Sequence, residues 1–255
     1  MKALVINLDR ETARLAFQQD QAARLGYELT RIAAVTVDAI APPLEAPIWA
    51  RWQRPLRGVE IATLMSHRIA WERVVAEGCA MLVLEDDAWL MNSAAAFLAQ
   101  LQAASDVELV TLETRGRRKI MGGRHADLPG LRRLYLDRSG AAAYVLWPDG
   151  ARKLLARADA VPALADAVLV EAAGLKRWQA DPAQAIQIDM ADRYGLSAPI
   201  AVASAISSVA RPGRGGWRFR VRRIYRQAVM GLIGLRTLFG AQRCEVQPAP
   251  QHEGR

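Results

Sequence analysis

The chain has 255 residues, of which 52% are hydrophobic and 24% are charged. These fractions provide enough apolar side chains for one full core or two small ones, and they exclude a disordered or fibrous protein. Its two cysteines, Cys79 and Cys244, are too few for a disulfide framework or a cysteine-rich zinc site. A reducing compartment therefore fits the composition best.

The formal net charge of +8 comes from the end of the chain. Residues 1–210 contain 24 Lys and Arg and 24 Asp and Glu, whereas residues 211–255 contain 10 Arg and only 2 Glu. We therefore expect an electrically balanced globular domain at 1–210 and an arginine-rich tail at 211–255. Binding to nucleic acid would need basic residues across the folded domain as well, so nucleic acid is not favoured as the partner.

Strand and helix patterns alternate along the domain. Continuous apolar runs at 3–8 and 79–84 predict buried strands, the alternation at 27–32 predicts another strand, and apolar residues at helical spacing that stop at a glycine predict helices. The expected strands cover residues 3–8, 27–32, 79–84, 107–112, 131–136 and 142–147, and the expected helices cover 11–25, 60–77, 94–104 and a segment that Pro148 begins. Residues 41–57, rich in Pro and Trp, and the basic residues 114–125 are expected to be loops. This order predicts a single α/β domain, with a Rossmann-like, mixed, mostly parallel sheet flanked by helices.

Three adjacent carboxylates, Glu85, Asp86 and Asp87, follow the apolar run at 79–84. They repel one another, and a turn needs only one Asp, Asn or Gly. Ligands of open α/β sheets bind beyond the carboxyl ends of the strands, where hard oxygen ligands suit Mg²⁺ or Mn²⁺. Strand alternation directs Glu85 and Asp87 to one side and Asp86 to the other. The alternative is a solvated acidic turn.

His67 lies on the helix expected at 60–77, without a second His four residues later or a Glu beside it. The sequence around it therefore does not form an HExxH zinc motif, and a buried, hydrogen-bonded histidine is favoured over a catalytic one. The glycine patterns of phosphate-binding and dinucleotide-binding loops are also missing from the sequence.

The order and spacing of several segments resemble glycosyltransferase family 25, the lipopolysaccharide and lipooligosaccharide glycosyltransferases related to collagen galactosyltransferases. The resemblance covers roughly residues 1–170. One departure is at residues 58–63, which stand where the family has a Gly-Glu-x-Gly-Cys stretch and lack its cysteine. The matching segments are Val5 to Arg10 with Arg14, Ser66 and His67 with Trp71, Leu82 to Asp87, Gly140 to Val145, Gly150 to Leu155, and Pro162 to Asp166.

The resemblance implies a GT-A-like fold, a nucleotide-sugar donor, usually a UDP-hexose, and a divalent metal, Mn²⁺ or Mg²⁺, held by Glu85 and Asp87. It also implies an inverting reaction, in which a carboxylate takes the proton of the attacking acceptor hydroxyl. Asp166 is the candidate base, because it is the only matched acid after the metal motif. Its alternative roles are to balance a helix dipole or to orient the acceptor.

Candidate donor-binding residues are Asn7, Arg10, Arg14 and Asp86. The first three follow the first strand, where a nucleotide or its phosphates would approach. Their alternative role is that of surface residues at the start of a helix. The acceptor that the resemblance implies is a glycan or glycolipid of cell-surface polysaccharide or lipooligosaccharide synthesis.

Residues 217–239 carry an apolar stripe at steps of three and four residues, and seven arginines without an acidic residue lie between 211 and 226. This pattern favours a basic amphipathic helix, with residues 211–239 resting on an anionic membrane surface. Alternatively, the helix packs on the domain and its arginines face water. Because no targeting or spanning segment is recognisable, we expect a cytoplasmic protein, peripheral on the inner face of the membrane. The stripe consists of Trp217, Val221, Ile224, Ala228, Leu232, Leu235 and Phe239.

A second hypothesis belongs to another functional class. A divergent, non-catalytic protein with the GT-A fold could act as a membrane-surface or nucleic-acid adaptor through its arginine-rich tail. Metal-dependent affinity for a nucleotide sugar would favour the enzyme, whereas salt-sensitive binding to liposomes or RNA without such affinity would favour the adaptor.

Overall fold

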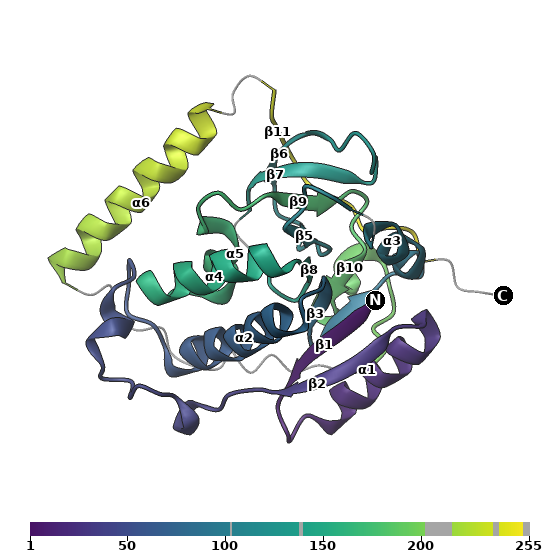
Figure 1. Ribbon diagram of the computed structural model, residues 1–255, viewed down its shortest axis with the longest axis horizontal. Helices are drawn as coiled ribbons and strands as arrows, with labels where there is room; N and C mark the ends of the chain where they lie inside the picture. Colours follow the sequence, from purple (N-terminus) through teal and green to yellow (C-terminus); the bar gives the residue numbers. More distant parts are fainter. Residues whose placement is uncertain (103, 138–139, 202–215, 237–239, 252–255) are drawn as a thin grey trace.

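The structure is a computed structural model that describes residues 1–102, 104–137, 140–201, 216–236 and 240–251. A nine-stranded sheet forms its centre, with helices on both faces (Figure 1). A separate two-stranded sheet pairs β4 (Ala88–Leu90) with β10 (Ala185–Gln187). The strands of the main sheet, in spatial order, are β11 (Gln242–Cys244), β6 (Lys119–Arg124), β7 (Leu131–Leu136), β9 (Arg177–Ala180), β5 (Leu109–Thr111), β8 (Ala143–Leu146), β3 (Met81–Glu85), β1 (Lys2–Asn7) and β2 (Glu28–Ala33).

The main sheet is mixed. β1 pairs in parallel with β2 and β3, and β5 pairs in parallel with β9, whereas β8 lies antiparallel between β3 and β5. Antiparallel pairs also join β9 to β7, β7 to β6 and β6 to β11. Most strands, namely β1, β2, β3, β5, β6 and β9, therefore run in one direction, which confirms the predicted mixed, mostly parallel, Rossmann-like sheet.

Helices cover both faces of this sheet. On one face lie α1 (Thr12–Leu25) and α3 (Ala94–Leu101), and on the other lie α2 (Gly58–Glu77), α4 (Pro148–Ala160) and α5 (Ala165–Glu171) (Figure 1). β1 serves both cores, because Leu4 and Ile6 pack on the α2 side while Ala3 and Val5 pack on the α1 side. A strand buried on both faces needs an apolar residue at nearly every position, which explains its sequence.

The ends of the first two helices follow the sequence signals. Gly26 and Gly78 terminate α1 and α2 in the left-handed conformation, with φ of 72° and 66°. Residues 41–57 form a connection that includes a short 3₁₀ turn (Pro47–Ala50), and both of its tryptophans, Trp49 and Trp52, are buried. Trp52 packs into the core on the α2 side, so this connection is ordered by what it covers.

The expectation of a loop over residues 114–125 is wrong for its second half. β6 occupies Lys119–Arg124 and pairs with β7 on one side and β11 on the other. Its sequence, Lys-Ile-Met-Gly-Gly-Arg, lacks an apolar alternation, and its register with β7 is irregular. The strand exists because its two neighbours supply hydrogen-bonding partners, and this information is not local to the segment.

The end of the chain contains both a helix and a strand. α6 (Trp217–Arg236) matches the helix expected at 217–239 as far as residue 236, while residues 211–215 and 237–239 of the predicted segment lie outside the described residues. β11 then returns to the main sheet, beyond the domain boundary predicted at 210. Within the described ranges, no helix has the length and apolar character needed to cross a membrane.

Candidate active site

The three carboxylates lie where β3 ends, beside the end of β1. Glu85 is the last residue of β3, and Asp86 and Asp87 form the turn that leads into β4. The amide Nε2 of Gln187, at the end of β10, lies 3.5 Å from Glu85 Oε2 and 3.1 Å from Asp87 Oδ2. Glu85 and Asp87 thus share one partner, whereas Asp86 turns to the α1 side. The alternation expected from the sequence is present in the structure.

Asp86 joins two of the predicted donor-binding residues. Asn7 Nδ2 donates to Asp86 Oδ2 at 2.9 Å, and Arg14 donates to Asp86 Oδ1 at 3.1 Å. Burial raises the pKa of Asp86, and the hydrogen bonds from Asn7 and Arg14 oppose this shift. Arg10 does not join this group, because its exposed side chain pairs with Glu11. The structure therefore gathers Asn7, Arg14 and Asp86, and it leaves Arg10 at the rim.

Arg31 completes the surroundings of Asn7, and the sequence analysis missed it. Its Nε donates to Asn7 Oδ1 at 3.0 Å, its guanidinium donates to the Asn7 backbone carbonyl at 3.1 Å, and it forms an ion pair with Asp9. An arginine within the β2 strand pattern was the available signal, although nothing local to β2 indicates its partner. Asn7 is thus held by Arg31 through its oxygen and binds Asp86 through its nitrogen.

Glu85 is held from the α2 side by a chain of buried side chains. His67, fully buried on α2, has Nε2 at 3.1 Å from Glu85 Oε1 and Nδ1 at 2.9 Å from the Tyr144 hydroxyl. The indole nitrogen of Trp71 donates to the same hydroxyl at 2.7 Å. This confirms the interpretation of His67 as a buried, hydrogen-bonded histidine.

The available hydrogens determine which atom donates in each of these hydrogen bonds. An indole can only donate and a tyrosine hydroxyl carries one hydrogen, so Tyr144 accepts from Trp71 and donates to His67 Nδ1. Burial raises the pKa of Tyr144, which keeps this hydrogen in place. The remaining ring hydrogen of His67 lies on Nε2 and is directed at Glu85. Glu85 therefore receives a hydrogen bond from the protein interior.

The carboxylates around Glu85 share one electrostatic environment. Burial, followed by the charge of Glu85, raises the pKa of Asp87 to about 7 and that of Glu113 to about 8. Burial also raises the pKa of Asp166 to about 6, and the charges of Glu85 and Asp137 add to this shift. Glu85 is the common contributor to all three shifts, so the structure brings Asp166 into the electrostatic range of the predicted metal ligands.

Glu113 is a site residue that the sequence analysis missed. It follows β5 and is fully buried; its Oε1 accepts from the Ala142 backbone N–H at 2.6 Å, and its Oε2 has no hydrogen-bond partner within the described residues. A weaker signal was available, because Glu113 follows the strand expected at 107–112 as Glu85 follows the strand expected at 79–84. Glu113 is a single carboxylate, however, and the argument from three adjacent carboxylates does not select it.

Asp166 lies in the first turn of α5, as the helix-dipole interpretation requires. The Ala167 backbone N–H stabilises its charge and opposes the effect of burial on its pKa. Its Oδ1 is buried and has no hydrogen-bond partner in the part of the chain that the structure describes. The N-terminus of α5 therefore explains the interaction of Asp166 with the Ala167 N–H. It does not explain the buried Oδ1, which is left for another group to bind.

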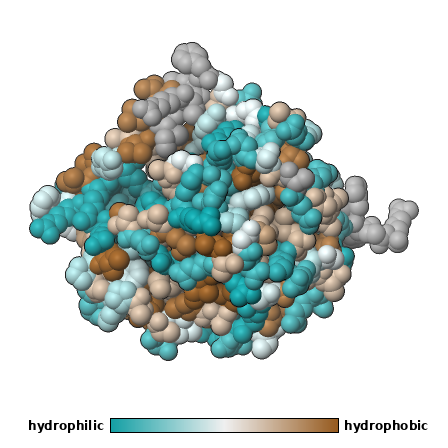
Figure 2. Space-filling view, viewed as in Figure 1, coloured by the Kyte–Doolittle hydropathy of each residue, from teal (hydrophilic) through white to brown (hydrophobic). Residues whose placement is uncertain are grey.

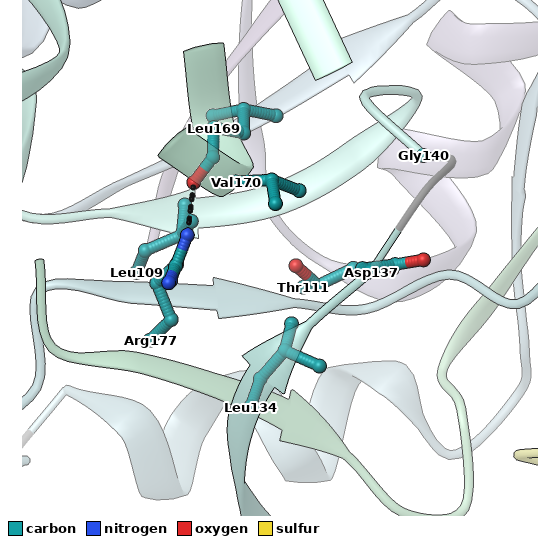
Figure 3. A pocket seen from close by; sticks show the side chains of 8 residues that line it. All are labelled: Leu109, Thr111, Leu134, Asp137, Gly140, Leu169, Val170 and Arg177. Carbon is teal, nitrogen blue, oxygen red and sulfur yellow. Dashed lines mark hydrogen bonds between the residues drawn. The ribbon is translucent and has the colours of Figure 1, made fainter. Parts of the chain in front are cut away.

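A small cavity lies behind this region, between α5 and the strands β5, β7 and β9 (Figure 3). It has room for about one water molecule. Asp137, on its wall, forms a 2.6 Å ion pair with the buried Lys119, and Arg177 donates to the Leu169 carbonyl. This cavity is far too small for a sugar nucleotide. Its lining consists of Leu109, Thr111, Leu134, Asp137, Gly140, Leu169, Val170 and Arg177.

The metal prediction can be compared with the arrangement of Glu85 and Asp87. Within the described residues, no group of three or more His, Cys, Asp or Glu side chains is placed to enclose a metal. A Mg²⁺ or Mn²⁺ ion that bridges substrate phosphates needs only one or two protein carboxylates, however. In the described structure neither carboxylate pairs with Lys or Arg, and the raised pKa of Asp87 marks a place where a cation would be favourable. These two residues fit such an ion.

A model of glycosyltransferase family 25, described as an LPS biosynthesis protein, matches residues 1–169, about two thirds of the chain. The chain belongs to glycosyltransferase family 25. The matched range contains Glu85, Asp87, Glu113 and Asp166, so membership covers the whole carboxylate group, and the protein is a glycosyltransferase. No curated protein matches the chain.

Solved structures with a similar arrangement include a glycosyltransferase involved in the glycosylation of the major capsid of PBCV-1, at 7% identity and a TM-score of 0.40. That match covers 73% of this chain and 91% of the other. The inositol-1-phosphate CTP transferase from T. maritima matches at 13% identity and a TM-score of 0.38, over 73% of this chain and 68% of the other. At such scores neither likeness bears on the function.

The hydrogen-bond chain predicts that Tyr144→Phe destabilises the fold. Loss of the hydroxyl leaves Trp71 Nε1 and His67 Nδ1 buried without a partner, which costs about 1–3 kcal/mol of unfolding free energy. Urea denaturation measures this cost. Tyr225→Phe, on the exposed side of α6, is the matched control and should leave the unfolding midpoint unchanged. Equal unfolding midpoints for Tyr144→Phe and Tyr225→Phe would contradict this hydrogen-bond chain.

Glu113 predicts a pH dependence of stability. Its pKa is about 8 in the folded protein against an ordinary value of 4.5, so between these values the folded state keeps a proton that the unfolded state has released. The unfolding free energy contributed by this group therefore falls as the pH rises through that window. Glu113→Gln should lose less stability than the wild type between about pH 5 and pH 8, as measured by urea denaturation. Glu72→Gln, at an exposed position, should retain the wild-type slope.

Proposed function

We propose that this family 25 enzyme is an inverting, metal-dependent hexosyltransferase with a GT-A-like fold. Its donor is a nucleotide sugar, a UDP-hexose, and its acceptor is a glycan or lipid-linked glycan of cell-surface polysaccharide or lipooligosaccharide synthesis. The observation that carries the proposal is the carboxylate group at the end of β3. In this group burial, with the charge of Glu85 added to it, raises the pKa of Asp87, Glu113 and Asp166.

Glu85 and Asp87 are the residues that would hold the divalent ion. When bound, such an ion neutralises the negative charge that develops on the diphosphate leaving group. The protein keeps both carboxylates in place by separate means: His67 donates to Glu85, and Gln187 donates to Asp87. The orientation of the Gln187 amide is itself set by Arg115, which donates to its oxygen. Because these hydrogen bonds already hold Glu85 and Asp87, the two side chains lose little conformational freedom when they bind an ion.

Asn7, Arg10 and Arg14 are assigned to the donor side, together with Asp86. Asn7, Arg14 and Asp86 are tied to one another beside α1, and the exposed guanidinium of Arg10 lies beyond them. An arginine at the rim can meet a diphosphate in bidentate geometry without losing a buried partner. In this arrangement Asp86 positions Arg14 and Asn7 rather than the metal.

Asp166 is assigned the role of base. It belongs to α5, on the sheet face opposite α1 (Figure 1), so the metal ligands lie between the assigned donor side and Asp166. An inverting reaction needs the base and the leaving group on opposite faces of the sugar, and this order supports that requirement. The raised pKa makes Asp166 a better proton acceptor near neutral pH, while it remains ionised above about pH 6.

Loss of the metal ligand should abolish transfer without unfolding the protein. Asp87→Asn should lower the rate of hexose transfer with Mn²⁺ at least ~100-fold, because the charge on the leaving group is no longer neutralised. The protein should also lose the Mn²⁺-dependent thermal shift with UDP-sugar, a stabilisation of about 2.7 kcal/mol for the wild type at a ligand concentration 100 times its Kd.

The matched control for this experiment is Asp20→Asn, which changes an exposed carboxylate on α1 and should retain both transfer and thermal shift. Screening UDP, GDP and CMP sugars with and without Mn²⁺ identifies the donor. A wild-type protein that binds none of them in the presence of metal would favour the non-catalytic adaptor over the enzyme.

Replacement of the base should affect chemistry and leave donor binding intact. Asp166→Asn should lower kcat about 10²–10⁴-fold, with an unchanged thermal shift for donor and Mn²⁺. In the wild type, kcat/KM should rise with pH through about 6, as Asp166 loses its proton. An Asn variant with wild-type kcat would leave Asp166 only its role at the helix N-terminus.

A further inference from the structure

The apolar stripe of α6 faces away from the protein. Trp217 is 72% exposed, Ile224 is 59% exposed and Leu235 is 62% exposed. Figure 2 shows hydrophobic residues along the outer edge of this helix and hydrophilic residues on the side nearer the body. Apart from Val37, Leu44 and Ile69, every large hydrophobic residue that is exposed in the described structure belongs to α6. The exposed apolar side chains of α6 are Trp217, Val221, Ile224, Tyr225, Val229, Leu232 and Leu235.

Arginines attach the opposite side of α6 to the body. Arg226 forms an ion pair with Glu171 of α5, and its guanidinium lies 5.2 Å from the ring centre of Trp52. Arg222 donates to the backbone carbonyls of Ala50 and Trp52. These polar and cation–π contacts hold the helix against the body, and among the described residues its apolar stripe stays exposed.

This arrangement is the reverse of the usual surface helix, which buries its apolar stripe against the core and exposes its charges. Each large apolar side chain left in water forgoes the free energy that its burial would contribute. A contiguous exposed stripe of this kind marks a surface that something else covers.

The charges beside the stripe identify what covers it. Arg218 and Arg220 are exposed and border the stripe on its two sides, and the sequence of α6 contains no acidic residue. Long cationic side chains beside an apolar stripe reach from a hydrocarbon layer to anionic headgroups. A second copy of the same stripe would instead bring two rows of arginine together, which is unfavourable.

We propose that α6 docks this protein on an anionic lipid surface, with the helix axis in the plane of the membrane and the stripe inserted. Since α6 is too polar and too highly charged to span a membrane, it lies on the surface. Arg222 and Arg226 keep their contacts with the body in this state, so docking needs no rearrangement of the helix. This inference is independent of the proposed activity, and a catalytically inert protein would dock in the same way.

One consequence does rest on the proposed function. Arg226 binds Glu171 at the end of α5, whose first turn carries Asp166. The element that holds the assigned base is thus tied directly to the element that meets the lipid. The acceptor class that suits this arrangement is a glycan on a lipid embedded in the same surface, with its sugar at the height of α5.

Vesicle co-sedimentation of the full-length protein tests the docking. Phosphatidylcholine vesicles containing about 30% phosphatidylglycerol should bind the protein, pure phosphatidylcholine vesicles should bind it at least ~10-fold more weakly, and high salt should weaken the binding. The double variant Ile224→Asp with Leu232→Asp should lose at least ~10-fold in affinity. Arg218→Ala and Arg220→Ala should each lose about fivefold.

The control for this test is Ile69→Asp, which places the same charge at an exposed apolar position of α2 and should bind as the wild type. Circular dichroism and the donor thermal shift show that each variant remains folded, so a lost vesicle interaction and a lost active site are separate results. Wild-type binding by the double variant, or equal affinity for neutral and anionic vesicles, would overturn the proposal. So would a wild-type dimer in solution that the double variant dissociates, because a second copy would then be what covers the stripe.

Discussion

The burial of several carboxylates around Glu85, at the end of β3, is the constraint on which the rest of the site depends. Burial, with the charge of Glu85 added to it, raises the pKa of Asp87, Glu113 and Asp166, which come from three different parts of the chain. The sheet creates this proximity, because β3 and β5 lie on either side of β8 and end at the same edge. The hydrogen bond from His67 supports Glu85 from the interior. Under the proposed function, a divalent cation held by Glu85 and Asp87 would offset part of this negative charge.

Two buried carboxylates of the candidate site lower the stability of the folded protein. Glu113 is fully buried with an oxygen that lacks a partner in the described structure, and Asp166 has an unpartnered oxygen as well. Burying carboxylates in this way is unfavourable unless a counter-charge arrives. Proteins violate the rules of stable packing mainly at functional positions. Glu113 follows β5 and Asp166 lies in the first turn of α5, while the apolar strands β1, β3 and β8 supply the stability.

Much of the fold could be predicted from local patterns, and the part that could not depends on distant partners. The apolar runs of β1 and β3, the glycines that end α1 and α2, and the stripe of α6 are visible within a few residues of sequence. β11 is not, because it forms by pairing with β6 across more than a hundred residues of chain. β6 is not either, because its sequence lacks an apolar alternation and its partners β7 and β11 lie outside it. At the candidate site, motif and resemblance predict Glu85, Asp87 and Asp166. Glu113 was overlooked although its position after a strand matched that of Glu85, and the contacts of Arg31 and Gln187 required the tertiary structure.

The return of the chain after α6 changes the meaning of a truncation. β11 adds the outermost strand to the main sheet beside β6, and Val246 and Ala249, just beyond it, are buried in the body. Cutting the protein after its globular domain to obtain a shorter form would therefore strip a strand from the sheet along with the helix. The backbone groups of β6 would then lie open to pairing with other molecules. Insolubility of such a shortened protein would therefore indicate an uncovered edge of the sheet, and it would not be evidence that α6 binds lipid.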